Sequence, residues 1–210
     1  MKKLLISLGL TAVFASISTV SLAAPVNLST WLVLGDAIVS STTAKLTTAF
    51  SSEAALGSGA IDINLLESQL STPSGTLGLN IFEGSALTQS FSLVSSSTLS
   101  FNWTLATDMF NAGFADLAFV LVDGTLLLPL ANVSAQELSG GFGYSFNAGT
   151  HTLAFGVVDV DDVDGVSTLS VSNLNLVSVT AVSEPGTLAL MLMGLAGLGL
   201  RVARSKPQSH

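Results

Sequence analysis

Short runs of apolar residues recur between residues 25 and 182, separated by clusters of Gly, Ser, Asn and Asp. In the clearest run, Ser97 to Leu105, an apolar side chain occupies every second position, which is the period of a β-strand with one buried face. Trp103 falls on this apolar face, so we expect it in the core. Runs of this kind predict strands over residues 32–39, 77–82, 91–95, 97–105, 115–122, 126–130, 143–146, 151–160 and 166–176.

Turn signals connect these runs. Asp123-Gly124 is a two-residue hairpin signal, and Asn147-Ala-Gly149 marks a second turn. Residues that favour helices, such as Lys, Arg, Glu and Gln, are scarce in this part of the chain. The pattern therefore predicts an all-β domain, a β-sandwich, over residues 25–182. Residues 40–75 are less regular and rich in Ser, Thr, Ala and Gly, so we expect long loops or a short helix there.

The first 24 residues have the three parts of a secretory signal peptide. Met1-Lys2-Lys3 is positively charged, and Leu4 to Val20 is mostly apolar. Small residues between Ser21 and Ala24 offer a cleavage site before Pro25 or one residue earlier. We therefore expect residues 1–24 to be removed on export.

The opposite end of the chain predicts a membrane-spanning helix. Residues 187–200 carry no charge, and with their flanks they extend to 186–203, close to the roughly 20 residues that a bilayer core needs. Three cations follow, and the positive-inside rule keeps them in the cytoplasm: Arg201, Arg204 and Lys206. The bulk of the protein would then lie outside the inner membrane. The alternative is a buried core helix followed by a basic tail.

Residues 183–210 resemble the PEP-CTERM sorting signal of Gram-negative bacteria, which combines a Pro-Glu-Pro motif, an apolar helix and an Arg-rich tail. Glu184 and Pro185 match the last two motif positions, and Ser183 stands where the family usually has proline. The resemblance implies recognition by an exosortase, a membrane protease-transpeptidase. This partner would remove the tail after a transient stay in the inner membrane. The protein would then reach the cell surface, the outer membrane or the extracellular matrix.

The body of the chain is similar to a jelly-roll-like domain that is common among PEP-CTERM proteins. Four segments carry this similarity: Leu99–Trp103, Asp116–Val120, Asn147–Val160 and Ser170–Leu176. Asn173 occupies a position where that family more often has aspartate. The resemblance implies a lectin-like sandwich, and it brings no defined activity with it.

Without its two terminal segments, the chain is strongly acidic. Residues 25–184 hold all fourteen acidic residues and a single base, Lys45, which gives a formal net charge of −13. A surface this acidic repels the phosphates of nucleic acid and attracts cations. The chain has no cysteine, which excludes disulfides and thiol chemistry.

Four aspartates fall within six residues of the segment after residue 158: Asp159, Asp161, Asp162 and Asp164. Their mutual repulsion would be relieved by a cation with oxygen ligands, and calcium is the expected ion outside the cytoplasm. The spacing does not follow the EF-hand pattern. The alternative is a solvated acidic hairpin tip. Asp108 and Asp116 flank another loop that could supply further ligands.

Catalytic signals are weak, and we assign no catalytic residue. His151 is the only histidine between the two terminal segments, and the sequence has no Gly-x-Ser-x-Gly motif. Two carboxylates would suffice for glycoside hydrolysis, but the sequence does not show which of its glutamates lie close together. The glutamates considered for that role are Glu53, Glu67, Glu83 and Glu137.

Three functions are therefore compatible with the sequence. The first is a noncatalytic, exported surface or matrix protein that contacts carbohydrate or exopolysaccharide, with calcium as a candidate cofactor and no cofactor as the alternative. The second is a secreted polysaccharide-active enzyme that uses carboxylates. The third is a purely structural matrix protein without a ligand. Nucleic acid is not an expected partner.

Overall fold

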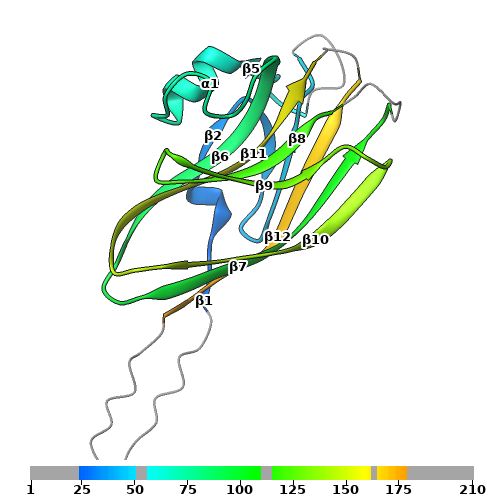
Figure 1. Ribbon diagram of the computed structural model, residues 1–210. Helices are drawn as coiled ribbons and strands as arrows, with labels where there is room; N and C mark the ends of the chain where they lie inside the picture. The colour runs from blue at the N-terminus through cyan, green and yellow to red at the C-terminus, as the bar shows by residue number, and fades with distance from the viewer. Residues whose placement is uncertain (1–23, 51–55, 110–114, 162–164, 179–210) are drawn as a thin grey trace, which may run out of the picture. The chain divides into compact units, whose positions relative to one another are not determined.

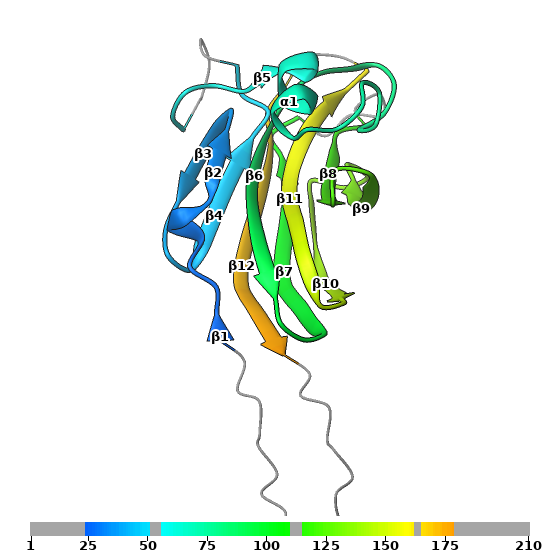
Figure 2. The same ribbon diagram turned by 90° about the vertical axis from the view of Figure 1, so that its left-hand side faces the viewer.

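Two antiparallel sheets face each other and form a β-sandwich (Figures 1 and 2). The computed structural model describes residues 24–50, 56–109, 115–161 and 165–178, which belong to one unit. The expected all-β sandwich is confirmed. The predicted sorting signal and almost all of the predicted signal peptide lie outside this description. Within the described ranges, no helix is both long and apolar enough to cross a membrane.

The first sheet, called sheet A here, has five strands in one path and a sixth beside it. In spatial order the path is β10 (Glu137–Phe146), β7 (Ser97–Thr107), β12 (Ser167–Ser178), β4 (Thr43–Thr47) and β3 (Asp36–Val39). The short strand β1 (Ala24–Pro25) pairs with the last part of β12. The strand β12 therefore lies in the middle of sheet A.

The second sheet, sheet B, has the same plan. Its path is β2 (Leu32–Leu34), β6 (Ile81–Leu93), β11 (Gly149–Val160), β8 (Leu117–Val122) and β9 (Leu126–Asn132), and β5 (Ile61–Asp62) also pairs with β6. A 3₁₀ turn (Leu28–Thr30) precedes β2, and the helix α1 (Ile63–Gln69) follows β5. From β6 to β12 the chain crosses repeatedly between the two sheets.

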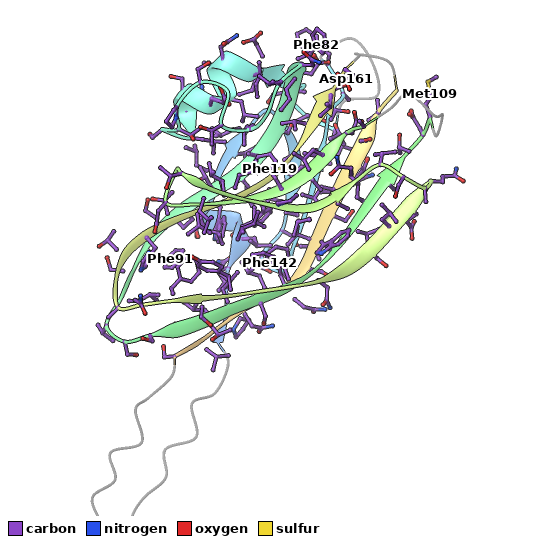
Figure 3. All side chains as sticks on the ribbon, viewed as in Figure 1. Phe82, Phe91, Met109, Phe119, Phe142 and Asp161 are labelled. Atoms are coloured by element: carbon purple, nitrogen blue, oxygen red, sulfur yellow. The ribbon has the colours of Figure 1, made fainter. Side chains whose placement is uncertain are left out.

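Sheet A buries only one face. In β7 the alternating apolar residues Leu99, Phe101 and Leu105 are at most 2% exposed, as the two-residue period predicted. Phe142 of β10 stacks on Phe101 with ring centroids 4.9 Å apart, and it lies between the two layers (Figure 3). Trp103 is half-buried and packs against this core, as expected.

Sheet B is buried on both faces over much of its length. Val120 faces sheet A, whereas its neighbour Phe119 faces the opposite way and packs with Leu66 of α1; all three are fully buried. The continuous apolar sequence of β8 follows from this, because a strand covered on both sides has no solvent-facing positions. Close packing on this sheet also requires glycine, the residue without a Cβ, at position 156 in β11. An added Cβ would overlap the carbonyl oxygen of Ser85 and lie 2.8 Å from Phe119 Cζ.

Some predicted strand boundaries were wrong. The predicted strand 32–39 is split at Gly35, whose φ of +81° sends β2 into sheet B and β3 into sheet A. The predicted strand 77–82 lies mostly in a loop, because β6 begins at Ile81. The same strand continues to Leu93 and so includes residues 91–93 of the predicted run 91–95. The hairpin after β8 has three loop residues, 123–125, because Val122 pairs with Leu126.

Long loops or a short helix were expected in the irregular region 40–75. The region contains the short helix α1 and also two strands that were not predicted, β4 and β5. Asp62 caps α1 by accepting a hydrogen bond of 2.8 Å from the amide of Asn64. Glu67 on α1 is 3% exposed, and its carboxylate accepts the amides of Gly75 (2.8 Å) and Leu77 (3.0 Å). This carboxylate therefore holds the loop that connects α1 to β6.

Asp36 at the start of β3 joins the two sheets. Its amide donates to Ser85 Oγ of β6 at 2.8 Å, and its buried carboxylate accepts the amides of Leu56 (2.8 Å) and Gly57 (2.6 Å) and the hydroxyl of Thr47. Burial alone would raise the pKa of Asp36. The hydrogen bonds from Thr47, from these amides and from Gly59 outweigh burial and lower that pKa.

Candidate functional site

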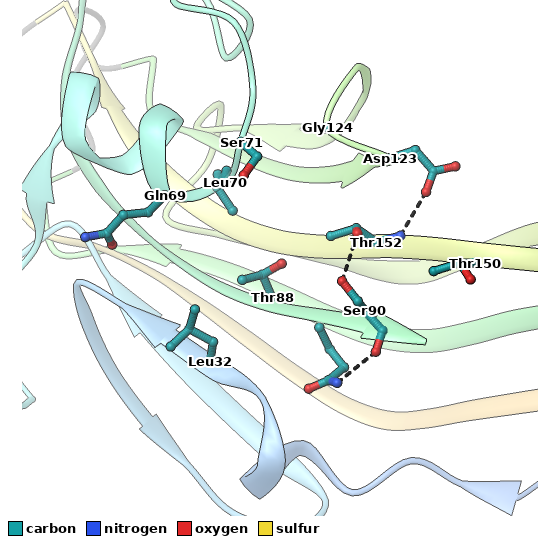
Figure 4. Close-up of a pocket in the computed structure, with 11 residues that line it drawn as sticks. Leu32, Gln69, Leu70, Ser71, Thr88, Ser90, Asp123, Gly124, Thr150 and Thr152 are labelled. Atoms are coloured by element: carbon teal, nitrogen blue, oxygen red, sulfur yellow. Dashed lines mark hydrogen bonds between the residues drawn. The ribbon is translucent and has the colours of Figure 1, made fainter. Parts of the chain in front are cut away.

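A groove of about 630 Å³ lies on the outer face of sheet B, beside the end of α1 (Figure 4). Its floor is formed by β6 and β11, one side by β2, and the other by residues that follow α1 and by the β8–β9 loop. The residues that line it are Leu32, Gln69, Leu70, Ser71, Thr88, Gln89, Ser90, Asp123, Gly124, Thr150 and Thr152.

Hydroxyl groups form the floor of this groove. Ser90 of β6 lies opposite Thr152 of β11, with Oγ and Oγ1 3.0 Å apart (Figure 4). The hydroxyl of Thr88 donates to the carbonyl of Leu153 at 3.1 Å. Ala86, on the same face of β6 as Thr88, belongs to the apolar cluster that packs with α1. One face of β6 is therefore apolar where α1 packs against it and polar where the groove begins.

The wall beside α1 is fixed by a long-range hydrogen bond. Thr72 Oγ1 donates to the carbonyl of Gly124 at 2.5 Å, which ties the chain after α1 to the β8–β9 loop. Gly124 has a φ of +66°, and a Cβ there would lie 3.1 Å from the carbonyl oxygen of Ser71. Glycine therefore allows both the turn and the close contact of the two segments.

Asp123 supplies a carboxylate at the rim of the groove. Its Oδ1 accepts the amide of Thr152 at 2.8 Å, and its Oδ2 lies 2.9 Å from His151 Nδ1. Burial tends to raise the pKa of Asp123, but the hydrogen bonds from His151 and from the Thr152 amide outweigh it and lower that pKa. The side chain of Asp123 is 46% exposed, so it is accessible to a ligand.

His151 lies behind this carboxylate. Its Nε2 is 3.1 Å from the carbonyl oxygen of Asn147, and its ring centroid lies 5.0 Å from that of Phe146 and 6.3 Å from that of Phe91. The hydrogen bond to Asp123 is the main reason that the pKa of His151 is raised. The side chain of His151 is only 17% exposed, and it forms an ion pair with Asp123 when the ring is protonated. Both ring nitrogens are occupied, which leaves neither to activate a groove hydroxyl.

The acidic segment after residue 158 is only partly described. Asp159 is 1% exposed, whereas Asp161 is exposed and accepts a hydrogen bond of 2.9 Å from Asn80 Nδ2. Figure 3 shows Asp161 at the same end of the sandwich as Met109. Asp162 and Asp164 lie outside the described residues. Calcium binding here stays a prediction.

The two other aspartates named as further ligands also bond to the backbone. Asp108 Oδ1 accepts the amide of Val166 at 2.7 Å, and Asp116 Oδ1 accepts the amide of Val160 at 3.3 Å. Over the part of the chain that the structure describes, no group of three or more His, Cys, Asp or Glu side chains could hold a metal ion.

The glutamates considered for hydrolysis are spread over the molecule. Glu67 and Glu83 are buried, at 3% and 7% exposure, whereas Glu137 is exposed at the start of β10. Glu53 lies outside the described residues. Since both oxygens of Glu67 accept backbone amides, that carboxylate has a structural task in the loop after α1.

The comparison with known sequences found neither a matching family model nor a matching curated protein. Among solved structures, a family 35 carbohydrate-binding module from an environmental isolate is 13% identical and covers 72% of this chain and 92% of its own, with a TM-score of 0.31. The N-terminal cellulose-binding domain of β-1,4-glucanase C from Cellulomonas fimi is 11% identical and covers 74% and 93%, with a TM-score of 0.34.

A third similar structure is a family GH115 4-O-methyl-α-glucuronidase, at 19% identity and a TM-score of 0.31. This match covers 46% of the present chain and only 14% of that enzyme. At these identities and TM-scores, the similarities carry no argument about what the present chain binds or catalyses.

Proposed function

We propose that this chain is an exported, noncatalytic surface or matrix protein, and that the groove on sheet B binds a neutral, hydroxyl-rich ligand such as a segment of exopolysaccharide. The hydroxyl floor of the groove carries this proposal. Ser90, Thr150 and Thr152 present donors and acceptors side by side on two neighbouring strands. Sugar hydroxyls are complementary to such a surface, because they also donate and accept.

The charge of the site narrows the class of ligand. Among the residues that the structure describes, the groove lining contains Asp123 and no basic residue, and residues 25–184 carry a formal net charge of −13. A polyanion such as a uronic-acid polymer would be repelled by this field. A neutral or amine-bearing polysaccharide would not. The carboxylate of Asp123 can accept hydrogen bonds from two adjacent sugar hydroxyls or from an ammonium group.

The terminal sequences support the proposed route to the cell surface. Residues 1–24 have the order of parts found in signal peptides, and residues 183–210 resemble a PEP-CTERM signal. An exosortase would then be the processing partner, and the inner membrane a transient location. The described body suits this route, because β1 and the end of β12 pair with each other and bring both connections to one place (Figure 2).

The binding test compares two hydroxyl pairs. Ser90→Ala with Thr152→Val removes the pair in the groove. The control, Thr98→Val with Ser145→Ala, removes a cross-strand pair 3.1 Å apart on sheet A. Each lost hydrogen bond weakens binding by about 0.5–1.5 kcal/mol. We therefore expect affinity electrophoresis in neutral polysaccharide gels to show roughly tenfold weaker binding for the groove variant and no change for the control.

Three outcomes would contradict the proposal. Equal retardation of both variants would place any binding site elsewhere. Absence of binding by the wild type to neutral and amine-bearing polysaccharides would favour the purely structural alternative. Release of reducing ends from the polysaccharide by the wild type would instead identify the chain as an enzyme.

A further inference from the structure

Each ring nitrogen of His151 faces a hydrogen-bond acceptor. Nδ1 faces a carboxylate oxygen of Asp123 at 2.9 Å, and Nε2 faces the backbone carbonyl of Asn147 at 3.1 Å. A carbonyl oxygen never donates, and an ionised carboxylate does not donate either. A neutral imidazole has one N–H, so one of the two contacts would place a nitrogen lone pair against an oxygen. Only the imidazolium form satisfies both contacts.

We infer that His151, protonated on both ring nitrogens, is a positioning residue that holds Asp123 at the rim of the groove, and that ligand binding weakens when His151 loses a proton. This inference rests on the proposed function, because it concerns regulation of the same groove. His151 does not line the groove and acts only through the carboxylate that does.

The surroundings of the ring favour the charged form. Phe91 reaches it from β6, and Phe146 reaches it from β10; both are uncharged, and the face of a phenyl ring tolerates a cation. Asn147 contributes a carbonyl from the β10–β11 turn. Asp123, on the β8–β9 loop, is the charged group that contacts the ring among the residues that the structure describes. No cation opposes protonation in these contacts.

A proton on His151 is linked to the groove through a short chain of contacts. Asp123 accepts from His151 on one oxygen and from the Thr152 amide on the other, so its carboxylate is fixed from two sides. Asp123 and Gly124 have φ values of +52° and +66°, and Gly124 is bonded to Thr72 in the wall. Loss of the proton removes one of the two ring hydrogen bonds and loosens either Asp123 or the turn that supports the ring.

The direction of the pH dependence follows from the pKa shift. The pKa of His151 is raised by its hydrogen bond to Asp123, so the imidazolium form persists above the ordinary histidine pKa. The positioning effect is therefore complete below that ordinary value, near 6.5, and is lost as the pH rises through the folded-state pKa. The pKa of Asp123 is lowered, so its carboxylate stays ionised across this range.

The experiment uses the ¹⁵N-labelled full chain in mild detergent. Histidine ring nitrogens are observed by NMR from pH 5 to 9, and the loss of signals in His151→Gln separates His151 from His210. We expect both His151 nitrogens to be protonated at pH 6. The titration midpoint of His151 should be higher in the wild type than in Asp123→Asn. The NMR signal of the Thr152 amide should shift with the wild-type midpoint. A neutral tautomer at pH 6, or the same midpoint in Asp123→Asn, would overturn the inference.

A binding arm separates this inference from the proposed function. Wild-type affinity for a neutral polysaccharide should fall severalfold across the His151 midpoint, whereas the affinity of His151→Gln should not change with pH. If wild-type affinity does not change across this midpoint, the regulatory part of the inference is wrong. Failure of every variant to bind overturns the proposed function, and the NMR titration then decides on its own whether His151 positions Asp123.

Discussion

The outer faces of the two sheets each carry a cross-strand pair of hydroxyl groups, but the surroundings of the two pairs differ. On sheet A, Thr98 and Ser145 form a cross-strand hydroxyl pair that is open to solvent. On sheet B, Ser90 and Thr152 form an equivalent pair, but the end of α1 and the β8–β9 loop stand beside it. Strand chemistry alone does not distinguish a candidate site from ordinary surface. The difference lies in the wall that the Thr72–Gly124 hydrogen bond holds in place.

The same contrast extends to packing. Sheet B has apolar side chains on both faces because α1 covers one of them, whereas sheet A has a solvent-facing side. Substitutions that add or remove a few atoms should therefore have unequal effects on the two sheets. Of the four predictions that follow, the first tests that inequality and the others test connections between the two sheets, from the largest expected effect to the smallest.

Gly156→Ala should destabilise the protein most. The new methyl group would overlap the Ser85 carbonyl and the ring of Phe119, and overpacking of this kind costs about 3 kcal/mol or more in the free energy of unfolding. Gly143→Ala on the edge strand β10 is the control, because no heavy atom lies within 4 Å of its added Cβ. Urea denaturation should show a change within about 0.5 kcal/mol for this control. Equal losses in both variants would refute the contrast between the sheets.

Asp36→Asn tests the joint between the sheets. The side-chain nitrogen of asparagine would replace one carboxylate oxygen, so a donor would face the amide of either Leu56 or Gly57. We expect a loss of about 2 kcal/mol in urea denaturation at pH 7. Asp62→Asn is the matched control, because Asp62 is exposed and asparagine is also a good helix cap. If both variants unfold at the same urea concentration, the hydrogen bonds of Asp36 do not stabilise the contact between the two sheets.

The same carboxylate sets a pH dependence. Because the pKa of folded Asp36 is lowered, its contribution to stability is present above the ordinary aspartate pKa, near 3.9, and is lost as the pH falls through the folded value. The difference in stability between wild type and Asp36→Asn should therefore begin to shrink below about pH 4 and be smallest below the folded-state pKa of Asp36. A difference between the two that stays constant down to pH 2 would contradict this assignment.

Calcium binding by the segment 159–164, which connects β11 of sheet B to β12 of sheet A, should have the smallest effect. At a tenfold excess over Kd, an ion that binds only the folded state adds about 1.4 kcal/mol of stability. Thermal melting in millimolar calcium against chelator, at fixed ionic strength, should shift Tm by a few degrees. Asp161→Asn with Asp164→Asn should abolish the shift. Identical melting of wild type and variant in both buffers would mean that this connection binds no calcium.

Local sequence pattern predicted the all-β class and at least part of each long strand, but it missed β4, residues 83–90 of β6 and residues 137–142 of β10. The alternation from Ser97 to Leu105 and the continuous apolar run of β8 each agree with how many faces of the strand are buried. The pattern failed where conformation depended on one residue. Gly35 lies inside an apolar run, and only its positive φ shows that the chain changes sheets there. Glycine is the signal that could have placed this break.

The candidate site could not be predicted in the same way. Ser90 and Thr152 are 62 positions apart, and His151 and Asp123 are 28 apart, so their contacts depend on strand register and on the order of strands in sheet B. Register is set by packing of the whole sandwich, which a local pattern does not encode. Asp123 was recognised as a turn residue, but its partner could not be inferred from the turn.

The position of β12 has a mechanical consequence. This strand pairs with β7 on one side and with β4 and then β1 on the other, so hydrogen bonds flank it on both sides. If the protein is anchored through its C-terminal side while the groove holds a ligand, a pulling force acts on the sandwich along β12. Pulling along a central strand must shear many hydrogen bonds at once, whereas an edge strand can be peeled away one bond at a time. The fold therefore presents a central strand, paired on both sides, to the proposed anchor.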